Sequence, residues 1–126
     1  MNGKIEDNKM ASLVPVLMVH QKSRMYISGP IAHYDLEERK QTFRRYERAI
    51  RTCNHVPVNP FKNRLYRDGI GDEASWRDHM REDIRMLLGC DYIVMLPGWE
   101  HSKGCKLELD VASSCGIKVL ILEARD

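Results

Sequence analysis

The 126-residue sequence lacks any uninterrupted apolar stretch long enough to cross a bilayer. The apolar run at residues 11–19 is short, contains Pro15 and precedes no small-residue cleavage site, so we expect a cytoplasmic protein without a membrane partner. A large excess of one charge is also missing, because 20 basic residues nearly balance 18 acidic ones. Proteins that bind polymeric nucleic acid usually carry a larger and more clustered positive charge, so we expect no such partner.

The sequence lacks the cysteine spacings of the common metal and disulfide motifs. The four cysteines are Cys53, Cys90, Cys105 and Cys115. No two of them form a C-x-x-C pair, and no histidine pair completes a zinc pattern. We therefore interpret them as reduced and mostly buried thiols, with no bound metal.

The length predicts a single domain of ordinary composition, with 43% hydrophobic and 30% charged residues and no internal repeat. Ordered structure is expected from Met25 onward, so residues 25–126 are assigned to the domain. Residues 1–24 are interpreted as an N-terminal extension that is either partly disordered or packed on a neighbouring subunit.

Short apolar strands alternate with amphipathic helices along this domain. Strands are predicted at residues 25–28, 55–58, 91–96 and 118–122, and helices at 35–53, 75–88 and 102–114. This β-α-β-α-β-α-β order predicts an α/β fold, a flavodoxin- or Rossmann-like three-layer arrangement with a parallel sheet of about four to five strands. Pro57 indicates an edge position for the second strand, whereas the apolar third and fourth strands are expected to be covered on both faces. Residues 61–74 are predicted to form a long loop, a length typical of lids and binding loops.

Loops at the carboxyl ends of the strands are the expected ligand site, because open parallel sheets bind ligands there. These loops cover residues 29–33, 59–61 and 97–104. His33 and His101 lie in or beside them and are candidates for ligand contacts. Trp99 either stacks on a base of the ligand or simply packs against the protein.

The helix at 102–114 carries a carboxylate on its apolar side. Cys105, Leu109 and Ala112 recur at helical spacing, and Glu108 projects from the same face. An ionised carboxylate there is costly unless it is paired or hydrogen-bonded, which makes Glu108 a candidate functional residue. The alternative is a helix edge at which Glu108 reaches solvent or an arginine.

Several other polar residues allow both a functional and a structural interpretation. Ser102 and Gly104 begin that helix, where backbone N–H groups favour an anion or a sugar hydroxyl, but Ser102 is also an ordinary N-cap. Asp83 lies beside the apolar stripe of the helix at 75–88, although its charged neighbours favour a solvated face. Tyr26, on the first strand, needs a hydrogen-bond partner whether it is functional or an ordinary core tyrosine.

Three segments carry a resemblance to a known family. They are the first strand Tyr26-Ile27-Ser28-Gly29, Asp83 ahead of the Asp91-Tyr92-Ile93-Val94 strand, and Ser102-Lys103-Gly104-Cys105-Lys106-Leu107-Glu108 followed by Ala112. Together they resemble the nucleoside 2-deoxyribosyltransferase family and its hydrolytic relatives, the 2′-deoxynucleoside 5′-monophosphate N-glycosidases. The last segment is similar to the Ser-x-Gly-x-x-x-Glu pattern of that family. The resemblance covers about residues 25–122.

The resemblance implies covalent catalysis without a metal or an organic cofactor. Glu108 would be the nucleophile that forms a glycosyl-enzyme, Tyr26 would orient it, and Asp83 would assist departure of the base. Ser102 and the Gly104 amide would hold the 5′ end of the sugar. The implied function is therefore cleavage or transfer of the N-glycosidic bond of a nucleoside or nucleotide. A homodimer or larger homo-oligomer is also implied, because sites in this family are completed across subunit contacts.

The first loop departs from the pattern of that family. Gly29, Pro30 and Ile31 are expected to line the substrate site, but Pro30 and Ile31 stand where the monophosphate hydrolases carry Ser and Arg. Lys103, His33 or a residue of a partner chain would then have to recognise a 5′-phosphate. Two other interpretations stay open, a nucleotide-binding module without chemistry and a flavodoxin-like interaction domain.

Overall fold

Four strands form one parallel sheet in the computed structural model, which describes residues 10–124. The strands are β1 (Arg24–Ser28), β2 (Val56–Val58), β3 (Tyr92–Met95) and β4 (Lys118–Ile121). Their spatial order is β2-β1-β3-β4, and every neighbouring pair is parallel. The chain moves from β1 outward to β2 and then crosses back to β3 on the other side of β1. The predicted α/β fold is therefore confirmed, with its topological switch point between β1 and β3.

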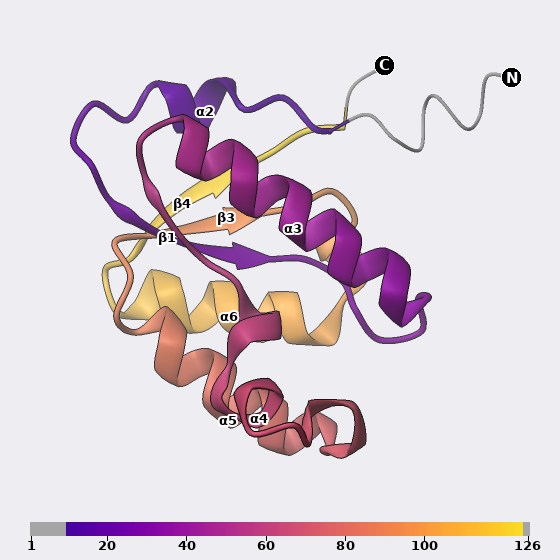
Figure 1. The fold of residues 1–126 in the computed structure, drawn as a ribbon. Coiled ribbons are helices and arrows are strands. Elements are labelled where there is room, and N and C mark those ends of the chain that lie inside the picture. Colours follow the sequence, from indigo (N-terminus) through magenta and orange to yellow (C-terminus); the bar gives the residue numbers. More distant parts are fainter. Residues whose placement is uncertain (1–9, 125–126) are drawn as a thin grey trace, which may run out of the picture.

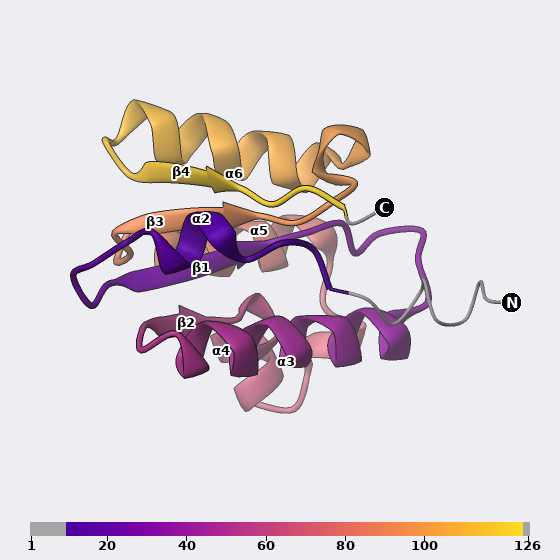
Figure 2. The same cartoon turned by 90° about the horizontal axis from the view of Figure 1, so that it is seen from above.

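Helices cover both faces of the sheet. Figure 1 shows α3 (Leu36–Thr52) above the sheet and α5 (Trp76–Leu87) and α6 (Lys103–Ser114) below it. Figure 2 shows β4, β3 and β1 following one another from α6 toward α3, with β2 at the level of α3. Alternate residues of β1 point to opposite layers: Met25 and Ile27 join the core beneath α3, whereas Tyr26 joins the core against α5 and α6. Ser28, two residues after Tyr26, therefore faces the α5 and α6 layer.

The segment before β1 packs on the core of its own chain. Residues 10–24 include the short helix α2 (Val14–Leu17), and Ala11 and Val16 are buried in the cluster beneath α3. The Ala11 N–H donates to the Tyr46 hydroxyl at 2.9 Å. Residues 10–24 therefore pack on their own chain, ahead of the boundary that the sequence predicted at Met25. Residues 1–9 of the predicted extension lie outside the described residues.

Three predicted helix starts have the expected side-chain caps. The oxygens of Asp35, Ser75 and Ser102 accept hydrogen bonds from the backbone N–H three residues later, at 3.2, 3.1 and 3.2 Å. The edge position of β2 is confirmed. Coverage of β3 on both faces is also confirmed, but β4 is the opposite edge and is only half-buried, so that prediction is wrong for β4.

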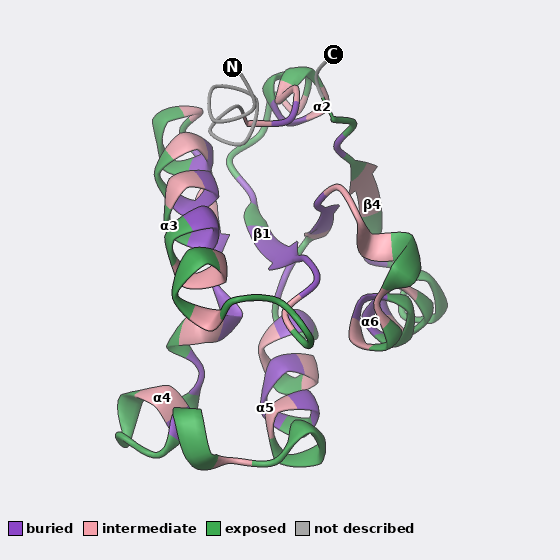
Figure 3. Ribbon diagram, turned by 90° about the vertical axis from the view of Figure 1, so that its right-hand side faces the viewer, coloured by how far each residue is buried: buried purple, intermediate pink, exposed green. Residues whose placement is uncertain are grey.

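Residues 61–74 do not form the predicted long loop. They fold with Pro60 into η1 (Pro60–Lys62), α4 (Arg64–Arg67) and η2 (Gly71–Glu73). Asn59 and Asn63 start η1 and α4, because their side chains accept hydrogen bonds from the N–H groups of Phe61 and Tyr66. Figure 3 places α4 beyond the end of the sheet, beside the start of α5.

Two further predictions concern membranes and thiols. None of the helices that the structure describes is both long and apolar enough to span a membrane. All four cysteines are free thiols; Cys90 and Cys105 are buried, Cys53 is half-buried and Cys115 is exposed. The prediction of free thiols is confirmed, and that of burial holds for two of the four.

Candidate active site

A cleft of about 550 Å³ opens at the carboxyl ends of β1 and β3. Four segments line it: residues 27–34 after β1, 60–66 around α4, 76–83 of α5 and 101–108 of α6. Gly29 lets the chain turn tightly into this cleft, because a Cβ there would lie 2.8 Å from the Leu96 side chain and 3.1 Å from the Phe43 ring. The cleft therefore lies at the topological switch point, where the sequence predicted a ligand site.

Glu108 lies on the second turn of α6, is only 6% exposed and lines this cleft. Both of its carboxylate oxygens accept hydrogen bonds from β1. The Tyr26 hydroxyl donates to Oε2 at 2.5 Å, and the Ser28 hydroxyl donates to Oε1 at 2.7 Å. No Lys, Arg or His side chain within residues 10–124 forms an ion pair with it. The predicted proximity of Tyr26 and Glu108 is thus present, and neutral donors alone hold the carboxylate.

Asp83 lies on α5, is 7% exposed and lines the same cleft. Its Oδ1 accepts a hydrogen bond from the Asn63 amide at 2.8 Å. The sequence pattern favoured a solvated face here, and that expectation is wrong. The helix buries Met80, Asp83 and Leu87 and exposes Leu88, because the α4 segment covers the side that carries the carboxylates.

Burial changes the acidity of both carboxyl groups. It raises the pKa of Glu108 from an ordinary 4.5 to about 7, against the opposing effect of the hydrogen bonds from Tyr26 and Ser28. The pKa of Asp83 is raised from 3.8 to about 8, mainly by burial and to a smaller extent by the charge of nearby Glu108, while the Asn63 hydrogen bond opposes this rise. At neutral pH the cleft therefore holds one carboxyl that keeps its proton and another that ionises more easily. Burial also raises the pKa of Tyr26 well above its usual 10, so its hydroxyl remains a donor.

The start of α6 contributes the predicted segment 102–104 to the cleft. The Ser102 hydroxyl oxygen accepts a hydrogen bond from the Cys105 N–H, so it has the capping role that was the structural alternative. A Cβ at Gly104 would lie 3.4 Å from the Met80 sulfur, so this glycine keeps the wall of the cleft close to α5. The Lys103 ammonium lies 4.6 Å from the centre of the Trp76 ring and places a cation at the rim.

Most other predicted contacts line the cleft, and one does not. Residues 29–31, His33 and His101 do so. Trp99 is half-buried and packs against the core between the sheet and α6, which was the structural alternative for this residue.

Sequence reasoning missed an aromatic wall and two polar residues. Tyr34, Phe61, Tyr66 and Trp76 line the cleft. Ser28 and Asn63 contact the two carboxyl groups directly. Ser28 could have been found from its two-residue spacing after Tyr26, which puts both side chains on one face of the strand. Asn63 could have been found only by recognising a helix cap within residues 61–74.

The chain matches a protein-family model. Residues 23–121 match the model described as "Domain of unknown function (DUF4406)". The matched span includes every residue that forms hydrogen bonds with the two cleft carboxyls. Among curated proteins, none matches the sequence.

Proposed function

The chain belongs to the DUF4406 family, and we propose that it cleaves or transfers the N-glycosidic bond of a nucleoside or nucleoside 5′-monophosphate. One observation carries this proposal. Glu108 lies in the cleft with neutral hydroxyls on both oxygens, and Asp83 in the same cleft has the higher pKa. A nucleophile and a proton donor with ordered pKa values are what a covalent glycosidase needs.

In the first step, a Glu108 oxygen attacks the anomeric carbon of the sugar. The bond from that carbon to the base nitrogen breaks, and its electron pair leaves with the base. Asp83 donates its proton to the base and becomes a carboxylate. Tyr26 and Ser28 favour ionised Glu108 before the attack and stabilise its charge again as the ester breaks.

In the second step, water attacks the anomeric carbon and releases Glu108 as a carboxylate. The Asp83 carboxylate accepts the proton of that water, which restores both groups. A second base in place of water would give transfer rather than hydrolysis. Asp83 thus gives one proton to the base and regains one from the attacking water, so the protons balance over the two steps.

The walls of the cleft suggest how a nucleoside would lie. With the sugar over Glu108, the base would extend past Asp83 toward the wall of Phe61, Tyr66 and Trp76, which offers flat apolar faces. The start of α6 would receive the 5′ end of the sugar through the Gly104 amide. Lys103 would be the cation nearest to a 5′-phosphate on that side.

The assembly follows from the resemblance to the nucleoside 2-deoxyribosyltransferase family, and the location is the one expected from the sequence. We propose a homodimer or larger homo-oligomer in which a second copy completes the cleft, and a cytoplasmic location. Sedimentation of the purified protein at several concentrations tests the assembly. A monomer that is fully active at nanomolar concentration would contradict it.

Base release tests the proposed reaction. The protein is incubated with a panel of nucleosides and 5′-monophosphates, with and without an acceptor base, and free base is measured by chromatography. We expect release by the wild type and none by Glu108→Ala. Binding without release would support the nucleotide-binding module instead. Neither binding nor release would support the interaction domain.

A further inference from the structure

A chain of hydrogen bonds runs from the backbone of η2 to the Asp83 carboxyl. The Gly71 carbonyl oxygen lies 2.6 Å from Nε2 of His79, and Nδ1 of the same ring lies 3.1 Å from the Asn63 amide nitrogen. That nitrogen donates to Oδ1 of Asp83 at 2.8 Å. Asn63 is 1% exposed, so its amide has no access to solvent.

Backbone groups fix the direction of every bond in this chain. The Gly71 carbonyl can only accept, so Nε2 of His79 carries the hydrogen and Nδ1 is the acceptor. The Tyr66 N–H can only donate, and it donates to Oδ1 of Asn63 at 3.2 Å, which settles the orientation of that amide. Both hydrogens of the amide nitrogen are thereby directed, one to His79 and one to Asp83.

The two oxygens of Asp83 consequently differ. Oδ1 accepts from Asn63, whereas Oδ2 has no hydrogen-bond partner within residues 10–124. A proton on Oδ1 would point at the amide hydrogen, so the acidic proton belongs on Oδ2.

We propose that Asn63 and His79 are positioning residues. They hold the Asp83 carboxyl so that Oδ1 accepts the hydrogen bond from Asn63 and Oδ2 carries the transferable proton. Residues 61–74 then supply the support that orients the acid, rather than a lid. The use of that proton on a departing base rests on the proposed function, but the orientation itself does not. The other titratable groups facing Asp83 are Glu108 from α6, Glu82 from α5, and the hydroxyls of Tyr26 and Tyr66.

We call the hydrogen-bond chain from Gly71 through His79 and Asn63 to Asp83 the relay. Titration of the Asp83 carboxyl by NMR tests it without any substrate. Protein labelled with ¹³C at aspartate carboxyls is titrated, and the Asp83 signal is assigned by its loss in Asp83→Asn. In Asn63→Asp the new side chain still caps α4, but it turns an acceptor oxygen toward Asp83. We expect the pKa of Asp83 to rise by at least about one pH unit, because two carboxyls then share one proton.

Two variants of His79 separate its two hydrogen bonds. His79→Asn keeps an acceptor at the position of Nδ1, so the pKa of Asp83 should stay within about 0.3 of the wild type. His79→Gln keeps the donor to Gly71 but loses that acceptor, so Asn63 is less well held and the pKa should rise by about 0.5 or more. Asn59→Asp is the matched control, since Asn59 also caps a short helix but forms no hydrogen bond with Asp83 within residues 10–124.

The outcomes separate the relay from the proposed reaction. An Asp83 titration that moves no more in Asn63→Asp than in Asn59→Asp would overturn the relay. If Asn63→Asp does not fold, equal pKa values in His79→Asn and His79→Gln would overturn it. If the titrations move as expected but the wild type releases no base from any nucleoside, the relay stands and the proposed function falls. In an active protein, His79→Gln should lower kcat about tenfold with KM unchanged and move the basic limb of the pH profile upward.

Discussion

Glu47 on α3 and Glu108 on α6 are buried to nearly the same degree on opposite faces of one sheet, at 7% and 6% exposure. Their partners differ. Glu47 forms an ion pair with the Lys62 ammonium at 2.7 Å and a longer one with Arg51, whereas Glu108 is held by two neutral hydroxyls. Burial alone therefore does not distinguish the carboxylate that we propose as the nucleophile. The absence of a cation within the described residues leaves Glu108 close to its protonation midpoint at neutral pH.

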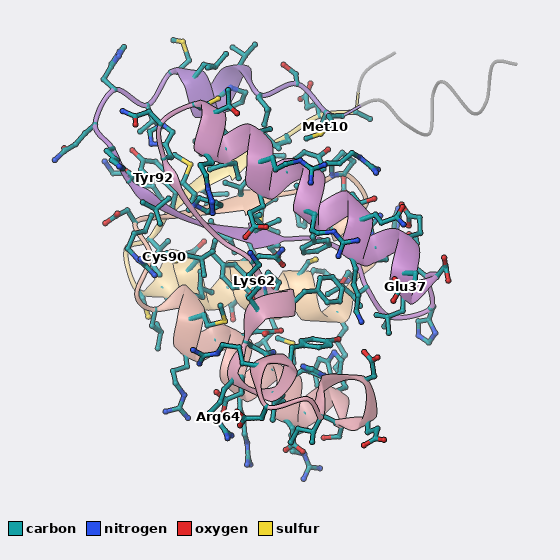
Figure 4. The ribbon with its side chains drawn as sticks, viewed as in Figure 1. Met10, Glu37, Lys62, Arg64, Cys90 and Tyr92 are labelled. Carbon is teal, nitrogen blue, oxygen red and sulfur yellow. The ribbon has the colours of Figure 1, made fainter. Side chains whose placement is uncertain are left out.

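The same contrast occurs within two adjacent residues of α5. Glu82 pairs with the Arg64 guanidinium at 3.3 Å and with Arg85 at 3.8 Å, and Asp83 accepts only from an amide. Figure 4 labels Lys62 and Arg64, the cations that pair with the two structural carboxylates. Two carboxylates thus have charged partners near the surface, and two lack them in the cleft.

The largest expected effect separates the two glutamates. Glu108→Gln should reduce base release on the order of 10⁴-fold or more, because the amide cannot form the glycosyl ester. Glu47→Gln should stay within about threefold of the wild type, since it alters only a partly exposed ion pair. Initial rates with one active nucleoside measure both. Equal losses of base release in the two variants would contradict a difference in role between Glu108 and Glu47.

The next effect separates the two neighbours on α5. Asp83→Asn should lower kcat by about 10²–10³-fold and abolish the basic limb of the pH profile, because its proton is no longer available to the base. In the wild type that limb is expected near pH 8 and the acid limb near pH 7. Glu82→Gln should keep the wild-type profile. A basic limb that survives in Asp83→Asn would assign the acid to another group.

Stability should depend on pH through Asp83. Its folded-state pKa is raised from 3.8 to about 8, so the stability linked to its proton is present at acid pH and is lost as pH rises through about 8. Asp83→Asn, which cannot ionise, should therefore gain stability relative to the wild type, on the order of 4 kcal/mol between pH 5 and pH 9. Urea denaturation at both pH values measures this gain. The exposed Asp110→Asn is the control and should show no such trend.

The smallest effects concern the hydroxyls on Glu108. Tyr26→Phe and Ser28→Ala should each lower kcat/KM about tenfold, because each removes one hydrogen bond to the carboxylate. Both should move the acid limb to higher pH, since these bonds lower the pKa of Glu108. Ser23→Ala removes a buried hydroxyl at the other end of β1 and should leave that limb in place. If the acid limb moves in neither variant, a group other than Glu108 is responsible for it.

The fold could be predicted from sequence because its signals are local. The caps at Asp35, Ser75 and Ser102 and the alternation of strands with helices fix the order of elements. Residues 61–74 could not be predicted in the same way, because α4 has a single turn and depends on the Asn63 cap rather than on apolar spacing. The packing of residues 10–24 was missed because it depends on contacts with distant residues such as Tyr46.

The site was predictable in part for the same reason. Glu108 stands out because a carboxylate interrupts an apolar stripe, and Ser102 and Gly104 follow from the helix start. Asp83 did not stand out, since its neighbours in sequence are charged. Its burial depends on α4, a distant segment that packs against α5. For Trp99 the sequence left stacking and packing open, because only the contacts of the folded chain place its ring against the core.

Covalent trapping tests the role of Glu108 most directly. The protein is incubated with nucleosides that carry fluorine at the 2′ position, which slows release of the sugar from the enzyme. Tryptic peptides are then weighed and fragmented. We predict that the peptide of residues 107–118 gains the mass of the fluorinated sugar on Glu108, in the wild type and in Glu47→Gln alike. Base release without an adduct on Glu108, or an adduct on Asp83 instead, would contradict the account.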